Sequence, residues 1–368
     1  MTPARARWRR EWCREWPRLA WRQARRNLLR AAVGAVVAAI VAAGYASVLT
    51  ADTDTGRTRL FKYIMGTSVR VEVYGGTAAT RQQAADEVFA SMAEVDRVMS
   101  DYRDDSELTR VNREATTQAV PVSPPLFAVL DAADRVARES GGAFDMTVRP
   151  LAVLWGLKSA TPHVPTATAL AAVRPLVGFR GLQLDAQAHT VRLTQRGMGI
   201  DLGGVAKGFA AELAAGALTR RGLSGVVDAG GHQHLVGAPL GKSAWTVGIA
   251  DPDNPGRLLG AVDVQRGGVS TTAHEPSRAP GVLANQVLDP RTLQPSPVCI
   301  SATVVSPDGT LAQALSQAAC VLGADAGLAL LERFPDTWGI IAVRRADGAT
   351  GLRVSPNYIG RFHPAAAS

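Results

Sequence analysis

The sequence predicts an α+β fold preceded by one N-terminal transmembrane or signal helix. Short runs that alternate apolar and polar residues are grouped as hairpins, as expected for half-buried strands. Longer stretches place apolar residues at helical spacing and would pack on those strands. The chain of 368 residues is long enough for one large domain or two small ones.

The N-terminal segment carries the whole formal net charge of +8. Residues 1–30 hold ten Arg and two Glu, so residues 31–368 sum to zero. A neutral body with a basic tail argues against a nucleic-acid groove and favours a segment that meets a membrane. We expect the Arg-rich tail, 1–30, to stay in the cytoplasm.

An uncharged run rich in Ala and Val follows at 31–50 and approaches the roughly twenty residues that cross a bilayer. It predicts an inner-membrane anchor with the body in the periplasm, or an export signal. Arg25-Arg26 just before it resembles a twin-arginine signal, although two adjacent arginines in an Arg-rich tail can be incidental. Gly44-Tyr45-Ala46 could be a cleavage site, so anchoring and release both stay open.

The body is expected to follow a linker at 51–60, to occupy 61–350 and to end in a tail at 351–368. Val69, Val71 and Val73 alternate as in a strand, and Val88, Met92 and Met99 fall on one helical face. Helices are predicted at 81–99, 124–140, 166–173, 209–221, 311–322 and 326–334. Strands are predicted at 69–73, 183–194 (as a hairpin), 226–228, 245–249, 260–264, 283–288, 300–305 and 338–343.

The stretch from Gly197 to Gly208 holds five glycines in twelve residues, and it also contains Asp201 and Lys207. Glycine has no Cβ to hold a ligand away, and the amides at the following helix start are suited to anionic oxygens. Asp201 could accept a hydrogen bond from a ligand, and Lys207 could face a phosphate. A glycine-rich turn with a solvated Lys explains the stretch equally well, because no Walker or dinucleotide spacing is met.

Further blocks flank this stretch in a fixed order, and together they resemble the FAD:protein FMN transferases, often called the ApbE family. The resemblance covers about residues 65–335 and implies an ApbE-like (T-fold-like) domain with mixed sheets. The blocks are Met65-Gly66-Thr67, residues 99–108, Gly141 to Leu151, Gly197 to Gly208, Asp228-Ala229-Gly230-Gly231 and Leu288-Asp289-Pro290-Arg291-Thr292.

The resemblance implies FAD as substrate, Mg²⁺ at its pyrophosphate, and transfer of FMN to a Thr of an acceptor flavoprotein. Lys207 and Arg291 are the candidate catalytic residues. Asp145 could instead be a structural Asp that caps the following turn, and Tyr102 could be ordinary half-buried surface. The candidate FAD-binding residues are Met65, Tyr102, Asp145, Asp201, Gly203, Gly204, Lys207, Gly208, Gly230, Gly231 and Thr271.

The sequence departs from the family at the positions that bind Mg²⁺ in its members. The family commonly uses a backbone carbonyl, here that of Ala206, with an Asp and a Thr one helical turn apart, where this chain has Gln313 and Gln317. A neutral amide is a weak substitute for a carboxylate at Mg²⁺. Asp308 or His232 could take part instead. Other departures are Asn285-Gln286 for a His pair, Gly230-Gly231-His232 for Gly-Gly-Asp, and Thr271-Thr272-Ala273 for Thr-Ser-Gly.

Two functions follow from these observations. The first is an extracytoplasmic FAD:protein FMN transferase, and the second is a catalytically weakened FAD-binding carrier or assembly factor for a redox complex. Cys13, Cys299 and Cys320 show no metal spacing. A disulfide between Cys299 and Cys320 is one option, but the helical position of Cys320 favours a buried thiol.

Overall fold

The computed structural model describes residues 50–52, 56–157, 162–254, 256–273, 287–296, 298, 300–345 and 348–365. The chain divides into two units, Met1–Val48 and Leu49–Ser368, and the described residues all belong to the second. The predicted Arg-rich tail and nearly all of the predicted membrane segment lie outside the described residues. Among the helices of the described part, none is both long and apolar enough to cross a membrane.

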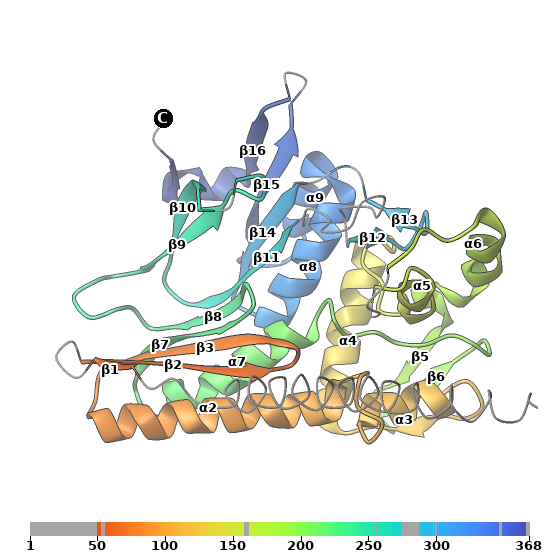
Figure 1. The fold of residues 1–368 in the computed structure, drawn as a ribbon, viewed down its shortest axis with the longest axis horizontal. Coiled ribbons are helices and arrows are strands. Elements are labelled where there is room, and N and C mark those ends of the chain that lie inside the picture. Colours follow the sequence, from red (N-terminus) through yellow and green to blue (C-terminus); the bar gives the residue numbers. More distant parts are fainter. Residues whose placement is uncertain are drawn as a thin grey trace, which may run out of the picture. The chain divides into compact units, whose positions relative to one another are not determined.

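A nine-stranded sheet forms the centre of the second unit (Figure 1). Its order is β1-β2-β3-β7-β8-β11-β14-β15-β16, and neighbouring strands pair antiparallel. This confirms an α+β fold, with antiparallel strand pairs in place of mixed sheets. The strands are β1 (Thr50–Asp52), β2 (Arg57–Ile64), β3 (Thr67–Tyr74), β7 (Ser224–Ala229), β8 (His232–Val236), β11 (Gly267–Ala273), β14 (Ser301–Ser306), β15 (Trp338–Arg344) and β16 (Thr350–Val354).

Helices cover one face of this sheet. Figure 1 shows α2 (Ala78–Met99) along β2 and β3, while α7 (Ala206–Arg220) packs on β7 and β8. Next to it, α8 (Gly309–Leu322) packs on β11 and β14, and α9 (Ala324–Leu331) on β15. The core between them includes the fully buried Val69, Val71 and Val73 of β3, as their alternation predicts.

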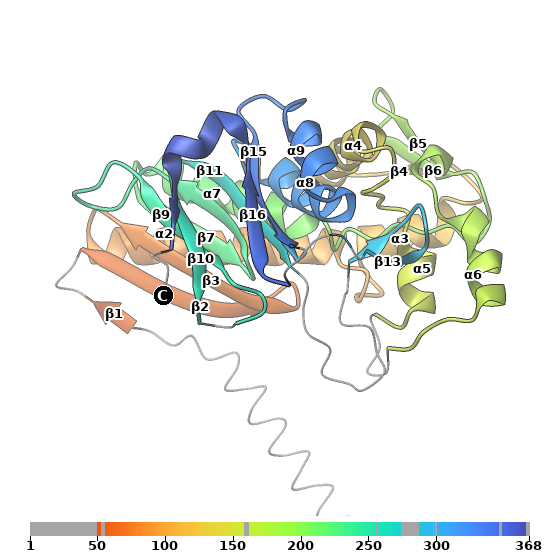
Figure 2. The ribbon, with the colours of Figure 1, turned by 90° about the horizontal axis from the view of Figure 1, so that it is seen from above.

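A small antiparallel sheet covers part of the other face. It consists of β9 (Trp245–Ala250), β10 (Leu258–Val264) and β17 (Phe362–Pro364), and Figure 2 shows β9 and β10 away from α8 and α9. Trp245 and Trp338 pack in a second apolar cluster between the two sheets. Side chains of one strand therefore alternate between two buried clusters, which fixes the register.

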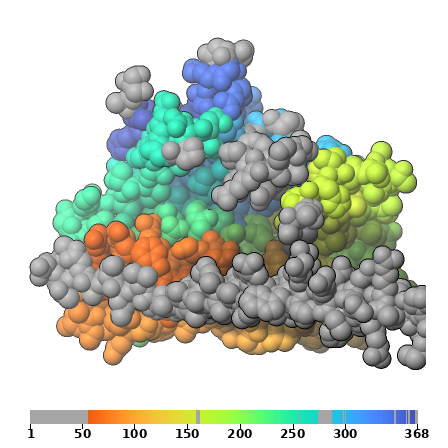
Figure 3. All heavy atoms as spheres, in the orientation of Figure 1, coloured from red at the N-terminus to blue at the C-terminus, as the bar shows by residue number. Residues whose placement is uncertain are grey.

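A helical segment with two small sheets flanks the large sheet beside α8. Here α4 (Pro124–Glu139) packs on α8. In the space-filling view, the yellow-green α5–α6 segment lies at the right of the visible face and the teal β9–β10 segment lies to its left (Figure 3). The other elements are α3 (Glu107–Glu114), β4 (Val120–Pro121), α5 (Arg149–Leu154), α6 (Ala167–Val173), β5 (Leu182–Asp185), β6 (Thr190–Leu193), β12 (Leu288–Asp289), β13 (Gln294–Pro295) and 3₁₀ turns at Arg174–Leu176, Phe179–Gly181 and Pro356–Arg361.

Several local predictions differ from the structure. The chain is already a strand from Arg57, where a linker was expected, and the expected tail carries β16 and β17. Strands β8 and β11 were not predicted, and most of the predicted strand 283–288 lies outside the described residues. Ser123 precedes Pro124 and was expected to cap the helix predicted at 124–140, but its hydroxyl instead donates to Glu107. Cys320 is disulfide-bonded, so the expected free thiol is wrong, and its partner lies outside the described part.

Candidate active site

A cleft of about 850 Å³ opens beside the start of α7. Its volume lies within the range of ligand and cofactor sites. The lining comes from chain segments far apart in sequence, so only the folded protein forms it. These segments are the β2–β3 turn, the end of α2 with the loop after it, residues 143–157, the glycine stretch, the β12 region and α8.

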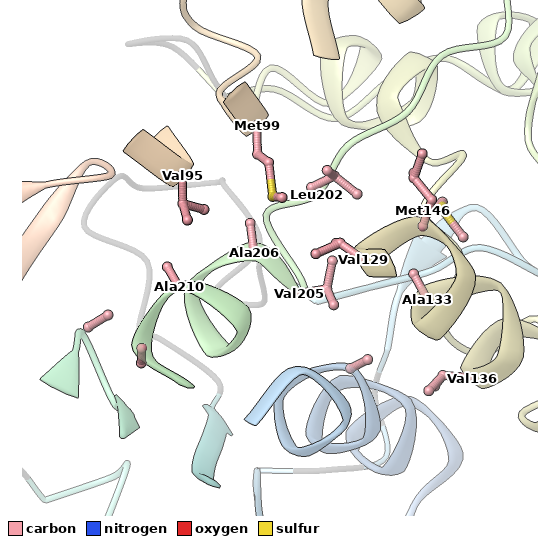
Figure 4. Packing of buried hydrophobic residues seen from close by; sticks show 14 of the residues in the cluster. Val95, Met99, Val129, Ala133, Val136, Met146, Leu202, Val205, Ala206 and Ala210 are labelled. Carbon is pink, nitrogen blue, oxygen red and sulfur yellow. The ribbon is translucent and has the colours of Figure 1, made fainter. Parts of the chain in front are cut away.

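The second half of the glycine stretch forms the floor of the cleft. Gly203, Gly204, Ala206 and Lys207, four of the predicted site residues, line it. A Cβ on Gly204 would lie 2.0 Å from Gln317 Oε1 and 3.0 Å from the Phe144 ring, so both side chains occupy the space that glycine leaves free and would have to shift for any larger residue. Below the floor, side chains from α2, α4 and α7 gather in the apolar core (Figure 4).

The β2–β3 turn contributes Met65 and Gly66 to the cleft edge. Both residues have positive φ (55° and 71°), and they are the two-residue loop between the paired Ile64 and Thr67. Such a loop is a type I′ hairpin turn, which follows the strand twist. Tyr63 donates to the Gly66 carbonyl at 2.9 Å, and this cleft-lining tyrosine was not predicted from the sequence.

Tyr102, in the loop after α2, also lines the cleft and is 74% exposed. An exposed aromatic ring beside an open cleft suits stacking on a flat heterocycle. The ring is therefore exposed rather than half-buried, and its stacking role stays a prediction.

The two predicted carboxylates have different surroundings. Asp145 is buried and accepts from the Thr147 amide, the Thr147 hydroxyl and the Phe179 amide, each at 2.7 Å. Burial nevertheless raises its pKa. These bonds favour the structural alternative for Asp145. Asp201 lines the same cleft with a half-buried side chain, and its Oδ1 accepts from the Gly203 amide at 2.7 Å, which shapes the floor.

Lys207 and Arg103 bring positive charge to the cleft, and Arg103 was not among the predicted site residues. Arg103 pairs with Asp105 at 2.9 Å and is close enough to lower the pKa of Asp96. Burial dominates, however, and raises the pKa of Asp96, a cleft-lining carboxyl that was also missed. A helix residue such as Asp96 carries no motif, so the sequence held no signal for it.

Five of the predicted catalytic and FAD-binding residues do not line the cleft. Arg291 pairs with Asp289 through two contacts of 2.9 and 2.8 Å, which raises its pKa, while Pro290 beside it reaches the cleft. Gly208 lies under the floor against α8, and the Thr271 hydroxyl is 2.8 Å from that of Thr303 inside the sheet. Gly230 and Gly231 form the β7–β8 hairpin turn with positive φ.

Gln313 connects α8 to the glycine stretch. Its Oε1 accepts from the Gly208 amide at 2.7 Å, and its Nε2 donates to the Gly203 carbonyl at 2.9 Å. The side chain is only 2% exposed, whereas the half-buried Gln317 lies beside Gly204 in the cleft.

The residues predicted for Mg²⁺ therefore do not fit it. Both polar atoms of Gln313 are already bonded to backbone, and Gln317 supplies only a neutral amide, whereas Mg²⁺ is usually bound through carboxylates. Across the described segments, no group of three or more His, Cys, Asp or Glu could hold a metal ion. The Ala206 carbonyl would be a lone ligand.

The two other candidates for the chemistry, His232 and Asp308, do not line the cleft. His232 is buried, its Nδ1 is 2.6 Å from Ser270 Oγ, and burial with the nearby Lys207 lowers its pKa to about 3. Asp308 caps α8 by accepting from the Leu311 amide at 2.9 Å. Beside it, burial and the Asp308 charge raise the pKa of Glu212 to about 7.

Comparisons with known proteins agree with this arrangement. The chain is 34% identical over 323 residues to the FAD:protein FMN transferase of Treponema pallidum, covering 81% of this chain and 89% of the relative. It is 31% identical to that of Klebsiella pneumoniae, covering 70% and 77%.

Solved structures give the same result. The flavin transferase ApbE from Vibrio cholerae superposes with a TM-score of 0.75 at 26% identity, covering 83% of this chain and 99% of that one. The ApbE protein from Thermotoga maritima gives 0.74 at 27% identity, covering 82% and 97%. The ApbE family model matches residues 65–341. The chain belongs to the ApbE family.

Proposed function

We propose that this protein transfers FMN from FAD to a threonine hydroxyl of an acceptor flavoprotein. The observation that carries the proposal is the cleft itself, which is lined by the glycines Gly203 and Gly204 together with the exposed Tyr102 and the cationic Lys207. The proposal is supported by the relatives named FAD:protein FMN transferase.

The reaction breaks one phosphoanhydride bond and forms one phosphoester. The acceptor hydroxyl oxygen attacks the phosphorus on the FMN side, AMP leaves with the electrons of the broken bond, and the hydroxyl proton is released. Negative charge grows on the phosphate oxygens during this step. Lys207, Arg103 and the amides at the start of α7 are the groups that would stabilise it.

The floor and the edges would orient the substrate. Gly203 and Gly204 allow the pyrophosphate to approach the backbone, and Asp201 keeps the loop turned by accepting from Gly203. Tyr102 and Tyr63, which both line the cleft, would stack on flat rings. No step needs Gln313 or Gln317 as a metal ligand.

Transfer is tested with purified full-length protein, FAD and a flavoprotein that carries an acceptor Thr. The expected product is a fluorescent band that survives denaturing electrophoresis and is lost when the acceptor Thr is changed to Val. Lys207→Met keeps the aliphatic stem without the charge and should slow transfer at least tenfold. Free FAD turnover without labelling of several acceptors would contradict the proposal.

A second function, a carrier or assembly factor that binds FAD without transferring it, is favoured by one observation. Gln313 and Gln317 leave the predicted metal position without a charged side chain. Tight FAD binding with no labelled acceptor would identify this function.

We also propose that the domain works outside the cytoplasm, on the acceptor flavoprotein of a membrane redox complex. The apolar run at 31–50 after an Arg-rich tail supports an anchor or export signal. The disulfide at Cys320 supports an oxidising compartment. Fractionation of cells that produce the full chain, with protease access to the body in spheroplasts, tests the location.

A further inference from the structure

We propose that the side-chain amide of Gln313 holds the floor of the cleft in its ligand-binding conformation, so that FAD binding needs no divalent cation there. Gln313 is then a positioning residue that acts through the backbone of the glycine stretch. The identity of the ligand rests on the proposed function, whereas the bridge rests on this chain's own hydrogen bonds.

The bridge joins two backbone groups on either side of the start of α7. Gly203 offers its carbonyl from the exposed floor, and Gly208 offers its amide from the first turn of the helix. Both bonds come from one side chain on α8 that is almost fully buried. Because a buried polar group without a partner is costly, losing the amide would release the floor from α8.

The orientation of the amide follows from its partners. A backbone N–H only donates and a carbonyl only accepts, so a flipped Gln313 would place like groups together. His232 extends the network, since its Nε2 lies 3.5 Å from Gln313 Nε2 and can accept when Nδ1 donates to Ser270. The strongly lowered pKa of His232 keeps the ring neutral, as this arrangement requires.

Close backbone packing makes the bridge possible. A Cβ on Gly208 would lie 2.2 Å from the Gly309 carbonyl oxygen and 3.0 Å from the Gln313 Cβ. The floor and α8 are therefore already in contact. A cation bound to Gln313 Oε1 would have to share that buried oxygen with the Gly208 amide, which already donates to it.

The first test measures FAD affinity of the full chain by flavin fluorescence, once in excess chelator and once in millimolar Mg²⁺. We expect the two dissociation constants to agree within about twofold. Gln313→Met, similar in length but without the amide, should weaken binding about tenfold in both buffers. Gln313→Glu can accept from Gly208 but cannot donate to Gly203 when ionised. Its loss of FAD affinity should therefore become smaller at low pH, where the carboxyl is protonated.

The matched control is Gln183→Met, on the exposed face of β5 and outside the cleft lining, which should leave FAD affinity unchanged. Circular dichroism checks that each variant is folded. An affinity that rises more than tenfold with Mg²⁺ would overturn the inference and leave the proposed function standing. Absence of FAD binding in both buffers would instead overturn the proposed function.

The second test needs no ligand. Hydrogen exchange of the Gly208 amide in the apo protein should speed up at least tenfold in Gln313→Met. The Ala206 amide, which donates to the Leu202 carbonyl at 2.8 Å, is the internal reference. Unchanged exchange at Gly208 in a folded Gln313→Met protein would show that the amide does not hold the floor.

Discussion

Two helices begin side by side in this protein, and their N-termini are satisfied in opposite ways. The start of α8 is bonded by carboxylates, since Asp308 accepts from the Leu311 amide and Glu212 accepts from the Gly309 amide at 2.8 Å. The start of α7 has no side-chain cap at Val205, and the amide that follows at Gly208 meets the neutral Gln313.

The difference teaches where an anionic ligand can bind. Carboxylates cancel the positive end of the α8 dipole, so this end attracts no further anion. A neutral amide satisfies one donor at α7 without cancelling the dipole, and Lys207 adds positive charge on the cleft side. The protein therefore has two similar helix starts, of which one is closed and one faces the cleft.

The largest expected effect comes from forcing the two helix starts apart. Gly208→Ala places a Cβ 2.2 Å from the Gly309 carbonyl oxygen, a backbone atom that cannot move aside easily. We expect a loss of about 3 kcal/mol in the free energy of unfolding, measured by urea denaturation. Gly216→Ala in the same helix meets only the flexible Arg220 side chain at 3.2 Å, and should be neutral or stabilise by up to about 1 kcal/mol.

A glycine on the cleft side of α7 should affect binding more than stability. Gly204→Ala would push Gln317 and Phe144 into the space beside the floor. We expect FAD affinity to fall about tenfold, which is about 1.4 kcal/mol, by fluorescence titration. Gly216→Ala, outside the cleft lining, should bind FAD as the unaltered protein does. Equal affinity for Gly204→Ala would show that the ligand does not contact the floor.

Removing a carboxylate from the closed helix start sharpens the contrast. Asp308→Ala deletes the α8 cap and should lower the free energy of unfolding by about 1 kcal/mol. Asp308→Asn retains an accepting oxygen and should lose less. If both variants were as stable as the parent in urea, the Asp308 cap would contribute nothing to the free energy of unfolding.

The smallest expected effect is a pH dependence at Glu212. Its pKa in the folded protein, about 7, exceeds the ordinary glutamate value of 4.5, so between these two pH values the folded state binds more protons than the unfolded state. Stability from this group is therefore present at low pH and is lost as pH rises through about 7. Glu212→Gln removes that slope.

Between pH 4.5 and 7.5, the free energy of unfolding of Glu212→Gln should increase relative to that of its parent by less than about 1 kcal/mol, because the group is partly exposed to solvent. Thermal unfolding at several pH values measures the difference. His234, whose pKa burial lowers to about 4, has the opposite slope, but it is present in both proteins and cancels. A constant difference across this pH range would contradict the raised pKa.

Local patterns predicted most of the elements on the helical face. The apolar spacing of Val88, Met92 and Met99 predicted a helix, and α2 buries all three. Strands β8 and β11 were missed because their residues do not alternate regularly between apolar and polar side chains. The segment His232–Val236 holds two histidines and a glutamine, and it is a strand through its pairing with β7 and β11.

In the candidate site, too, residues within one short stretch were predicted better than residues whose partners are distant in sequence. Gly203, Gly204, Asp201 and Lys207, which were predicted to contact FAD, all line the cleft, because they lie in one short stretch whose composition already suits close approach. Arg291 is paired with its neighbour Asp289 in a turn and does not line the cleft. Asp145 accepts a hydrogen bond from the Phe179 amide, 34 positions away, and no pattern in the sequence predicts that partner.

By itself, the sequence determined the family, the α+β class and the glycine floor, since blocks of short motifs and local periodicity encode them. Only the tertiary structure decided what Gln313 does. In the sequence it stands as the loss of a charged ligand, whereas in the fold its amide meets two backbone groups about a hundred positions away. Hydrogen bonds depend on distance and direction in space, and neither is written in the order of residues.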